Sequence, residues 1–165
     1  MIRKCTADDL SRILTIINRA AEAYREVIPG DCWHEPYMSQ EELKNGLRSG
    51  ILFSGFETDC KLVGVMGVQR VQDVTLIRHA YVSPDYQRQG IGSLLLTHCM
   101  DQTDTPLLVG TWADAAWAIT FYQQHGFQLV PEQDHDELLQ QYWEVPSRQR
   151  AASVVLGDDR WFSQT

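Results

Sequence analysis

The segment Gln87-Arg88-Gln89-Gly90-Ile91-Gly92-Ser93 has the residue types and spacing to bind an anion. It follows an expected strand and opens an expected helix. Its glycines let the backbone approach a ligand closely and adopt dihedral angles that other residues avoid. The first helical turn offers N–H groups without partners and the positive end of the helix dipole. A phosphate gains about 0.3–1 kcal/mol from that dipole, and Arg88 adds a charge-assisted hydrogen bond.

Two common nucleotide-binding motifs do not fit this loop. A Walker loop ends in Gly-Lys-Ser/Thr, whereas here Gly92 is followed by Ser93 and Leu94. A dinucleotide fingerprint has a third small residue where this chain has Leu95, and an acidic residue at a strand end about 20 positions later. Asp114 has the right separation but lies at the expected start of a helix. The structural alternative is that the glycines only form a tight strand-to-helix turn.

Two sequence blocks resemble motifs of the Gcn5-related N-acetyltransferase superfamily. Gln87-x-x-Gly90-x-Gly92, within residues 79–96, resembles its strand, acyl-CoA pyrophosphate loop and helix. Ala118-Ile119-Thr120-Phe121-Tyr122-Gln123-Gln124-His125-Gly126-Phe127 resembles its later helix and the start of a strand. The good matches cover residues 74–130. The superfamily often has Asn three residues before the alanine of the second block, and this chain has Ala115, so that cofactor contact falls to Asp114 or Trp117 instead.

This resemblance implies acetyl-CoA as the co-substrate. The pyrophosphate is expected on the loop amides, and the pantetheine arm is expected to run like an extra strand along the end of the central strand. The implied cofactor-binding residues are Ala80, Tyr81, Val82, Gln87, Arg88, Gln89, Gly90, Ile91, Gly92 and Ser93.

Tyr122 matches the tyrosine that lies beside the thioester sulfur in the superfamily. The resemblance implies that it is the general acid that protonates the departing thiolate. A phenol with a pKa of about 10 can protonate a thiolate whose thiol has a pKa of about 8.5 when the geometry is favourable and water is scarce. The alternative is a core aromatic on a helix face with Phe121 and Trp117.

The resemblance makes an amine the expected acceptor, and it must lose a proton before it attacks. Glu35 is the first choice for the base, with His34, Asp73, His79 or a water relay as alternatives. An expected acceptor pocket contains Trp33, Tyr37 and Trp112. Trp33 and Tyr37 either form an aromatic cage for a cationic or aromatic acceptor or cap the core.

Apolar spacing and turn residues indicate the elements that position these groups. The expected helices are 6–24 with a Thr6/Asp9 capping box, 39–50, one bearing Leu94, Leu95 and Cys99, and one capped by Asp114 and ended by Gly126. The expected strands are 51–57 and 61–69 as an antiparallel hairpin, 74–82, 107–109, 127–130 and 151–156. Residues 163–165 are expected to fray. The fold class is mixed α/β, with a central mixed sheet of six to seven strands flanked by four to five helices.

Composition narrows the class of protein further. The 165 residues suit one domain, and 14 basic against 22 acidic residues give a net charge of −8. An acidic chain is a poor ligand for nucleic acid and a better one for a cationic partner such as an amine. No apolar run or signal core indicates a membrane segment, and the four cysteines lack metal-ligand spacing. We therefore expect a cytoplasmic protein, and strand edges and residues 142–162 make a homodimer plausible.

The leading hypothesis is an acyltransferase that moves acetyl from acetyl-CoA to a primary amine, free or in a peptide, by direct attack in a ternary complex. Direct attack is favoured because neither motif block contains a cysteine to carry the acetyl group. The alternatives are a non-catalytic acyl-CoA-binding regulatory module, which would need no tyrosine, and a nucleotide-binding enzyme.

Overall fold

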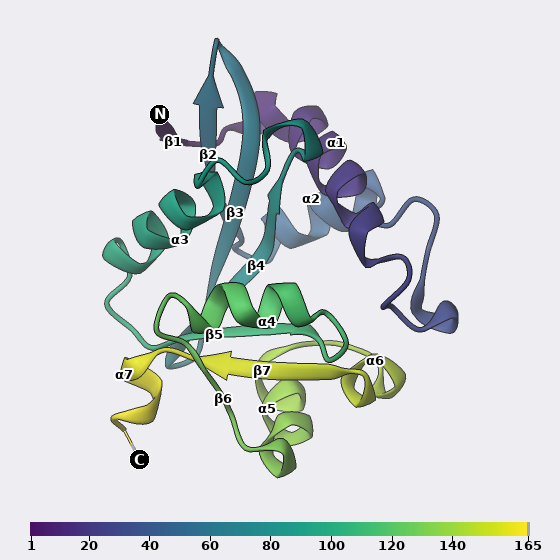
Figure 1. Ribbon diagram of the computed structural model, residues 1–165, viewed down its shortest axis with the longest axis vertical. Coiled ribbons are helices and arrows are strands. Elements are labelled where there is room, and N and C mark those ends of the chain that lie inside the picture. The colour runs from purple at the N-terminus through teal and green to yellow at the C-terminus, as the bar shows by residue number, and fades with distance from the viewer. Residues whose placement is uncertain (165) are drawn as a thin grey trace. The chain divides into compact units, whose positions relative to one another are not determined.

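The computed structural model describes residues 1–164, which form seven strands and seven α-helices together with short 3₁₀ turns (Figure 1). Contacts divide the chain into two compact units. Unit 1 comprises Met1–Ala23, His34–Arg70 and Ile77–Asp104, and unit 2 comprises Tyr24–Trp33, Val71–Leu76 and Thr105–Thr165. No helix in residues 1–164 is both long and apolar enough to cross a bilayer.

Unit 1 contains the first half of the sheet. It holds β1 (Ile2–Lys4), β2 (Leu52–Thr58) and most of β3 (Lys61–Val71) and β4 (Val74–Val82), whose order in the sheet is β1-β2-β3-β4. The β2–β3 pair is the expected antiparallel hairpin. Asp59 and Cys60 at its tip both have positive φ angles, of 50° and 59°, as a two-residue hairpin turn that matches the strand twist requires.

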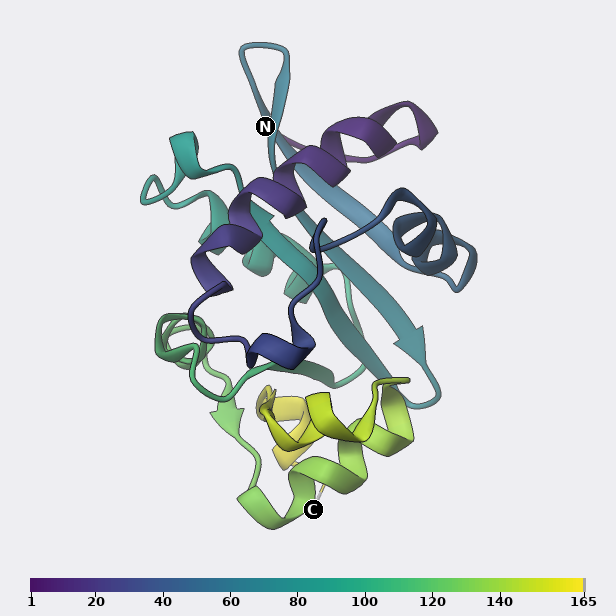
Figure 2. The same ribbon diagram turned by 90° about the vertical axis from the view of Figure 1, so that its right-hand side faces the viewer.

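Helices cover both faces of this part of the sheet. α1 (Leu10–Ala20) and α2 (Gln40–Arg48) lie on one face and α3 (Ile91–Asp101) lies on the other (Figures 1 and 2). Ile13, Ile16 and Ile17 of α1 are spaced three and four residues apart, so they share one face and are almost fully buried against Phe53 and Val65.

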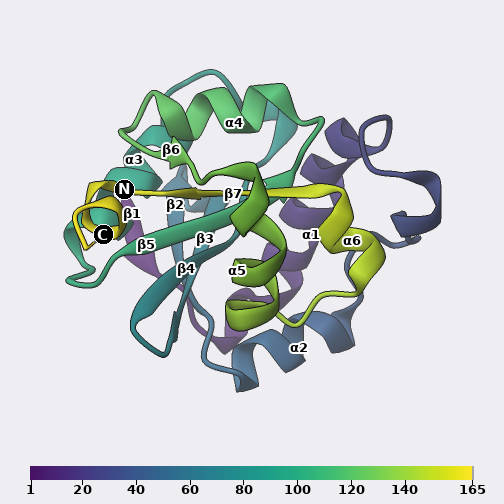
Figure 3. The same ribbon diagram turned by 90° about the horizontal axis from the view of Figure 1, so that it is seen from below.

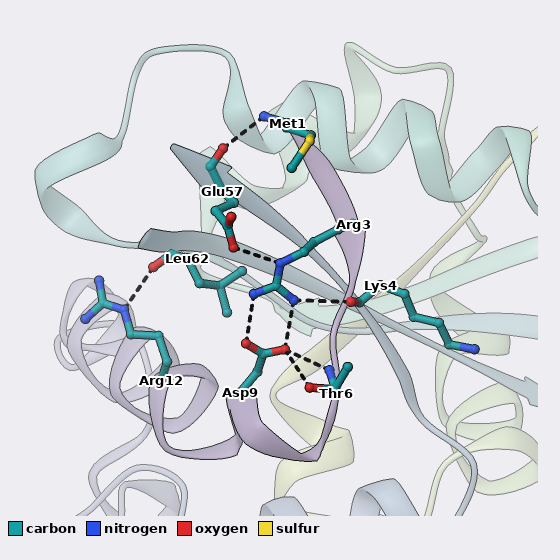
Figure 4. A network of polar contacts seen from close by, with 8 residues as sticks. All are labelled: Met1, Arg3, Lys4, Thr6, Asp9, Arg12, Glu57 and Leu62. Atoms are coloured by element: carbon teal, nitrogen blue, oxygen red, sulfur yellow. Dashed lines mark hydrogen bonds and ion pairs between the residues drawn. The ribbon is translucent and has the colours of Figure 1, made fainter. Parts of the chain in front are cut away.

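A polar network closes the N-terminal end of unit 1 (Figure 4). The Arg3 guanidinium donates twice to the Asp9 carboxylate, at 2.9 Å each, and its Nε donates to Glu57 at 2.8 Å. Asp9 also accepts from the Thr6 backbone N–H at 2.7 Å, which is one half of the expected capping box. This network ties β1 to β2 and to the start of the first helix.

Unit 2 contains the second half of the sheet. β7 (Ser153–Gly157) lies between β5 (Leu107–Trp112) and β6 (Gln128–Leu129) and is antiparallel to both. α4 (Ala116–Gln123) and α5 (His135–Tyr142) lie on opposite sides of β5 and β7 (Figure 3). The chain then forms α6 (Ser147–Ala151) before β7 and α7 (Asp159–Phe162) after it.

The core of unit 2 joins α5 to the sheet. Leu138, Leu139 and Trp143 pack with Leu108 and Val155 in one buried cluster. At the edge of this cluster the Tyr142 hydroxyl donates to Asp73 at 2.8 Å. Burial and this bond to a carboxylate raise the pKa of Tyr142 to about 12.

The mixed α/β class and the number of strands are confirmed, with local differences. The expected helix 6–24 is α1 flanked by 3₁₀ turns at Ala7–Asp9 and Ala21–Tyr24. Ala115, not Asp114, is the N-cap of α4, and no side chain caps that helix. β1, α5 and the short helices α6 and α7 were not expected from the sequence. Of the segment expected to fray, Thr165 lies outside the described residues.

Candidate functional site

The glycine loop is fixed to the end of β4 by its own residues. A 3₁₀ turn, Pro84–Tyr86, follows β4, and the Tyr86 N–H donates to the Ser83 carbonyl at 2.8 Å. The Gln87 side-chain amide then donates to the Val82 carbonyl at 3.0 Å. Arg88 has a left-handed φ of 63°, which a residue with a side chain rarely adopts. These hydrogen bonds within residues 82–87 therefore hold the backbone conformation that leads from β4 into the loop.

Gly90 forms the junction between this loop and α3. It is the N-cap of the helix with φ 81° and ψ 6°, a left-handed conformation that glycine adopts without steric cost. The first helical bond runs from the Leu94 N–H to the Gly90 carbonyl at 3.0 Å. The amides of Ile91, Gly92 and Ser93 precede the first helical donor, the Leu94 N–H, so they lie at the N-terminal end of an eleven-residue helix without an acceptor inside it.

The central strand β4 contains an irregularity directly before the predicted pantetheine-binding residues. His79 has a φ of 57°, so the strand is locally distorted where a regular strand was expected, and Ala80, Tyr81 and Val82 follow it. The His79 ring stacks on Phe53, with centroids 6.2 Å apart. Burial, helped by the positive charge of Arg78, lowers the pKa of His79 to about 3.

Residues 34–37 belong to unit 1 and lead into α2. His34 and Glu35 are exposed, and the Glu35–Pro36 peptide is cis. Tyr37 meets Tyr81 of β4 edge to face, with ring centroids 6.5 Å apart. The predicted acceptor residue Tyr37 and the predicted cofactor residue Tyr81 are therefore direct neighbours.

Tyr122 lies on the buried face of α4 in unit 2. Only 6% of its surface is exposed, and its ring contacts Phe121 and Phe127 at centroid distances of 5.1 and 5.6 Å. Its carbonyl accepts from the Phe127 N–H beyond Gly126, whose φ of 88° confirms the expected left-handed end of this helix. The position of Tyr122 is thus closely defined by packing.

The remaining predicted residues of unit 2 have defined contacts. Trp112 ends β5 and is buried. The Arg25 guanidinium lies 4.6 Å from the ring centroid of Trp33, so one face of this predicted cage residue already has a cation. Asp73 accepts the Tyr142 hydroxyl at the β3–β4 turn. Trp117, considered in place of the usual asparagine, is 46% exposed and contacts Tyr24 at a centroid distance of 5.1 Å.

The structure adds residues that the sequence did not single out. Arg19 of α1 reaches Ser83 and Asp85 at the entrance of the loop. Its only sequence signal was a basic residue near the end of an amphipathic helix. Within residues 1–164 no group of three or more His, Cys, Asp or Glu side chains is arranged to hold a metal ion.

Comparison with known proteins agrees with this geometry. Residues 51–129 match the acetyltransferase (GNAT) domain. That span contains β2 to α4 and ends in β6, so it includes the glycine loop and the Tyr122 helix.

Two curated relatives match parts of the chain. UPF0157 protein YqkA of Bacillus subtilis is 28% identical over 126 residues, which are 74% of this chain and 36% of that protein. The [Ribosomal protein bS18]-alanine N-acetyltransferase of Salmonella typhimurium is 34% identical over 73 residues, which are 42% of this chain and 49% of that protein. The matches thus span half or less of the length of these relatives.

Solved structures share the fold along nearly the whole chain. PaiA N-acetyltransferase from Thermoplasma acidophilum, in complex with coenzyme A, has a TM-score of 0.71 at 19% identity, covering 96% of this chain and 97% of that one. The ribosomal-protein-S18-alanine N-acetyltransferase from Escherichia coli has a TM-score of 0.70 at 22% identity, covering 96% and 92%. Residues 51–129 thus match an acetyltransferase (GNAT) domain, and residues across nearly the whole chain have the fold of these acetyltransferase structures.

Proposed function

We propose that this protein is an N-acetyltransferase that moves the acetyl group of acetyl-CoA to a primary amine by direct attack in a ternary complex. The observation that carries the proposal is the loop between β4 and α3. Left-handed Gly90 caps α3, so the amides of Ile91, Gly92 and Ser93 form the first turn at the positive end of a helix. The match of residues 51–129 to the acetyltransferase (GNAT) domain makes the pyrophosphate of coenzyme A the fitting anion for that position.

Cofactor recognition in this proposal uses mainly the backbone. The pyrophosphate accepts from the amides of residues 87–93, and the exposed Arg88 adds a charge-assisted bond. The pantetheine arm lies along Ala80, Tyr81 and Val82, where its amide groups pair with strand groups. The left-handed φ of His79 distorts β4 directly before these three residues, at the position where the proposal places the arm.

The chemical step exchanges a thioester for an amide. The neutral amine attacks the acetyl carbonyl carbon, a C–N bond forms, and the C–S bond breaks. The departing thiolate takes a proton from the Tyr122 hydroxyl, the attacking nitrogen releases its extra proton to solvent, and the phenolate recovers one from solvent. Burial of the Tyr122 ring supports this role because a fixed donor in a dry site transfers its proton efficiently.

The acceptor must also lose a proton. An alkylammonium with a pKa near ~10.4 is neutral in about one molecule in 2,500 at pH 7, which corresponds to about 4.6 kcal/mol. Glu35, exposed on the segment that leads to Tyr37, is our candidate base. His79 is a poor alternative, because a group with a pKa of about 3 holds a proton weakly.

The charge distribution supports an amine acceptor. Unit 2 carries 4 basic and 11 acidic residues, a net charge of 4 − 11 = −7, whereas unit 1 carries 10 − 11 = −1. The unit that contains Tyr122 therefore attracts a cationic acceptor. Two matched relatives are named for acetylating an alanine of a ribosomal protein. A peptide α-amine, with a pKa near ~8, would need less help from a base.

Two measurements test the proposal. In calorimetry we expect coenzyme A to bind and ATP and NAD not to bind, because the loop lacks the features of both nucleotide motifs. The protein is then incubated with acetyl-CoA and a panel of amines, including a peptide with a free α-amine, the same peptide with only a lysine amine free, and spermidine. Mass spectrometry should show a product 42 Da heavier for one class. Binding of ATP in preference to coenzyme A would contradict the proposal.

A further inference from the structure

One side chain from outside the glycine loop bonds at two positions to the turn that precedes this loop. Arg19, near the end of α1, donates from Nη1 to the Ser83 hydroxyl at 3.4 Å and from Nη2 to the Asp85 carboxylate at 3.2 Å. Ser83 itself is buried, and its N–H donates to the Val63 carbonyl of β3 at 2.8 Å. A helix far from the loop in sequence is therefore bonded to both a fixed point of the sheet and the exposed turn.

This arrangement contributes little to the stability of the fold. The side chains of Arg19 and Asp85 are 47% and 67% exposed, and ion pairs with such exposure add little to the free energy of unfolding. Its effect is expected nearby, at the anion site. Asp85 precedes Gln87 by two residues, so their Cα atoms are at most about 7 Å apart. That separation is shorter than the Debye length of about 10 Å at 0.1 M salt.

A carboxylate at this position opposes the binding of a pyrophosphate. Without a partner, Asp85 would repel the ligand that the loop amides attract, and the turn would lose its connection to α1. We propose that Arg19 is a positioning residue for the cofactor loop, which compensates the charge of Asp85 and holds the Pro84–Tyr86 turn against α1. This inference rests on the proposed function and adds a residue that lies outside both sequence motifs.

The test is the affinity of the full-length protein for coenzyme A, measured by calorimetry. Arg19→Ala should weaken binding about 5- to 10-fold, because it leaves the Asp85 charge uncompensated. Arg19→Lys keeps the charge but cannot make both contacts equally well, and should weaken binding about 2- to 3-fold. Adding Asp85→Asn to Arg19→Ala removes the repelling charge, so the double variant should recover at least half of the lost affinity.

Arg12→Ala is the matched control. Arg12 lies two turns earlier on α1, and its Nε donates to the Leu62 carbonyl of β3 at 2.9 Å. The Arg12→Ala substitution removes the same charge from the same helix as Arg19→Ala. We expect its affinity for coenzyme A to lie within 2-fold of the wild type. Thermal unfolding of each variant establishes that it is folded, and Arg19→Lys replaces Arg19→Ala if the latter is not.

The outcomes separate this inference from the proposed function. If the wild type does not bind coenzyme A, the proposed function fails. If the wild type binds and Arg19→Ala binds within 2-fold of it, or if Arg12→Ala loses as much affinity, the role of Arg19 is wrong. A double variant with no recovery would overturn compensation of Asp85 as its mechanism.

Discussion

Gly90 has a left-handed backbone conformation that a residue with a side chain adopts only with strain. Its φ of 81° lies in the left-handed region, and a Cβ added there would meet no atom within 4 Å. The cost of Gly90→Ala is therefore backbone strain, about 1–2 kcal/mol, and not a clash. We expect the loop to relax and its amides to separate, which should weaken coenzyme A binding about 10-fold in calorimetry.

Gly50→Ala is the control for strain alone. Gly50 has a φ of 103° and equally open surroundings, but it lies after α2. Both variants should lose similar stability in thermal unfolding, while only Gly90→Ala loses affinity. Equal affinity of the two variants for coenzyme A would argue against an anion site at the α3 N-terminus.

A substitution of Tyr122 tests the chemical step separately from the binding of coenzyme A. Tyr122→Phe removes only the hydroxyl, so the ring packing with Phe121 and Phe127 remains. Loss of a general acid typically lowers turnover about 10²-fold or more. We expect that decrease in kcat, measured by acetylated product, with coenzyme A affinity within 2-fold of the wild type.

Tyr142→Phe is the matched control for this substitution. Tyr142 is as buried as Tyr122, at 7% against 6% exposed, but its hydroxyl donates to Asp73. This variant should lose about 1 kcal/mol of stability from the hydrogen bond and keep its kcat. Unchanged turnover in Tyr122→Phe over a broad pH range would exclude the acid role and favour a non-catalytic acyl-CoA-binding module.

Among the helices and strands, those whose formation depends on neighbouring residues could be predicted from the sequence. The amphipathic face of α1 and the antiparallel β2–β3 hairpin follow from spacing and turn residues, and both are confirmed. β1 has three residues, too few to show a period, and it exists because it pairs with residues 54–56 of β2. α5 was missed because His135 and Tyr142, at the ends of its buried face, are not typical apolar residues.

The candidate site was predictable to a similar extent. The glycine loop and the tyrosine helix have local motifs, so their residues could be named from the sequence. The distortion of β4 could not, because His79 lies within a run of residues with ordinary strand propensity and its left-handed φ depends on tertiary packing. Arg19 was missed for the same reason, since its partners Ser83 and Asp85 are more than 60 residues away.

The segment Tyr24–Trp33 is an element whose position depends on a later part of the chain. It belongs to unit 2, where Asp31 accepts from the Arg148 Nε of α6 at 2.8 Å and Tyr24 contacts Trp117 of α4. Arg148→Ala should loosen this segment. We expect hydrogen–deuterium exchange of the amides in residues 25–33 to become several-fold faster, with little change in global unfolding, because the pair is exposed.

Arg150→Ala provides the comparison, since Arg150 of the same helix pairs with Asp136 of α5 at 2.9 Å instead. Exchange in residues 25–33 should remain at the wild-type rate in this variant. If both variants accelerate exchange there equally, the effect comes from α6 as a whole and not from the Arg148–Asp31 pair.

For the whole molecule, acid stability should depend on the N-terminal network. The hydrogen bonds from Arg3 lower the pKa of Asp9 to about 2, below its ordinary value of 3.8. A carboxyl with a lowered folded-state pKa stabilises the protein above its unfolded pKa, and the contribution disappears as the pH falls from about 4 to about 2. Allowing for solvent screening, we expect Asp9→Asn to cost about 1–2 kcal/mol at pH 7.

Urea unfolding at pH 7 and at several points between pH 4 and 2 measures this contribution. The difference between wild type and Asp9→Asn should shrink as the pH falls. Asp8→Asn, which alters the neighbouring exposed acid, should behave like the wild type. A difference between wild type and Asp9→Asn that is constant over this range would contradict the assignment.

The winding of the chain through both units has a consequence for its synthesis. The Asp31–Arg148 pair spans 117 residues, so Asp31 leaves the ribosome well before its partner. At ordinary elongation rates of about 5–20 residues per second, that interval is roughly 6–23 s. During it, residues 24–33 and their tryptophan have no completed scaffold to join. Residues 24–33 can reach their final contacts only after the last third of the chain has been translated. The last helices to be synthesised therefore complete a structure that begins near the N-terminus.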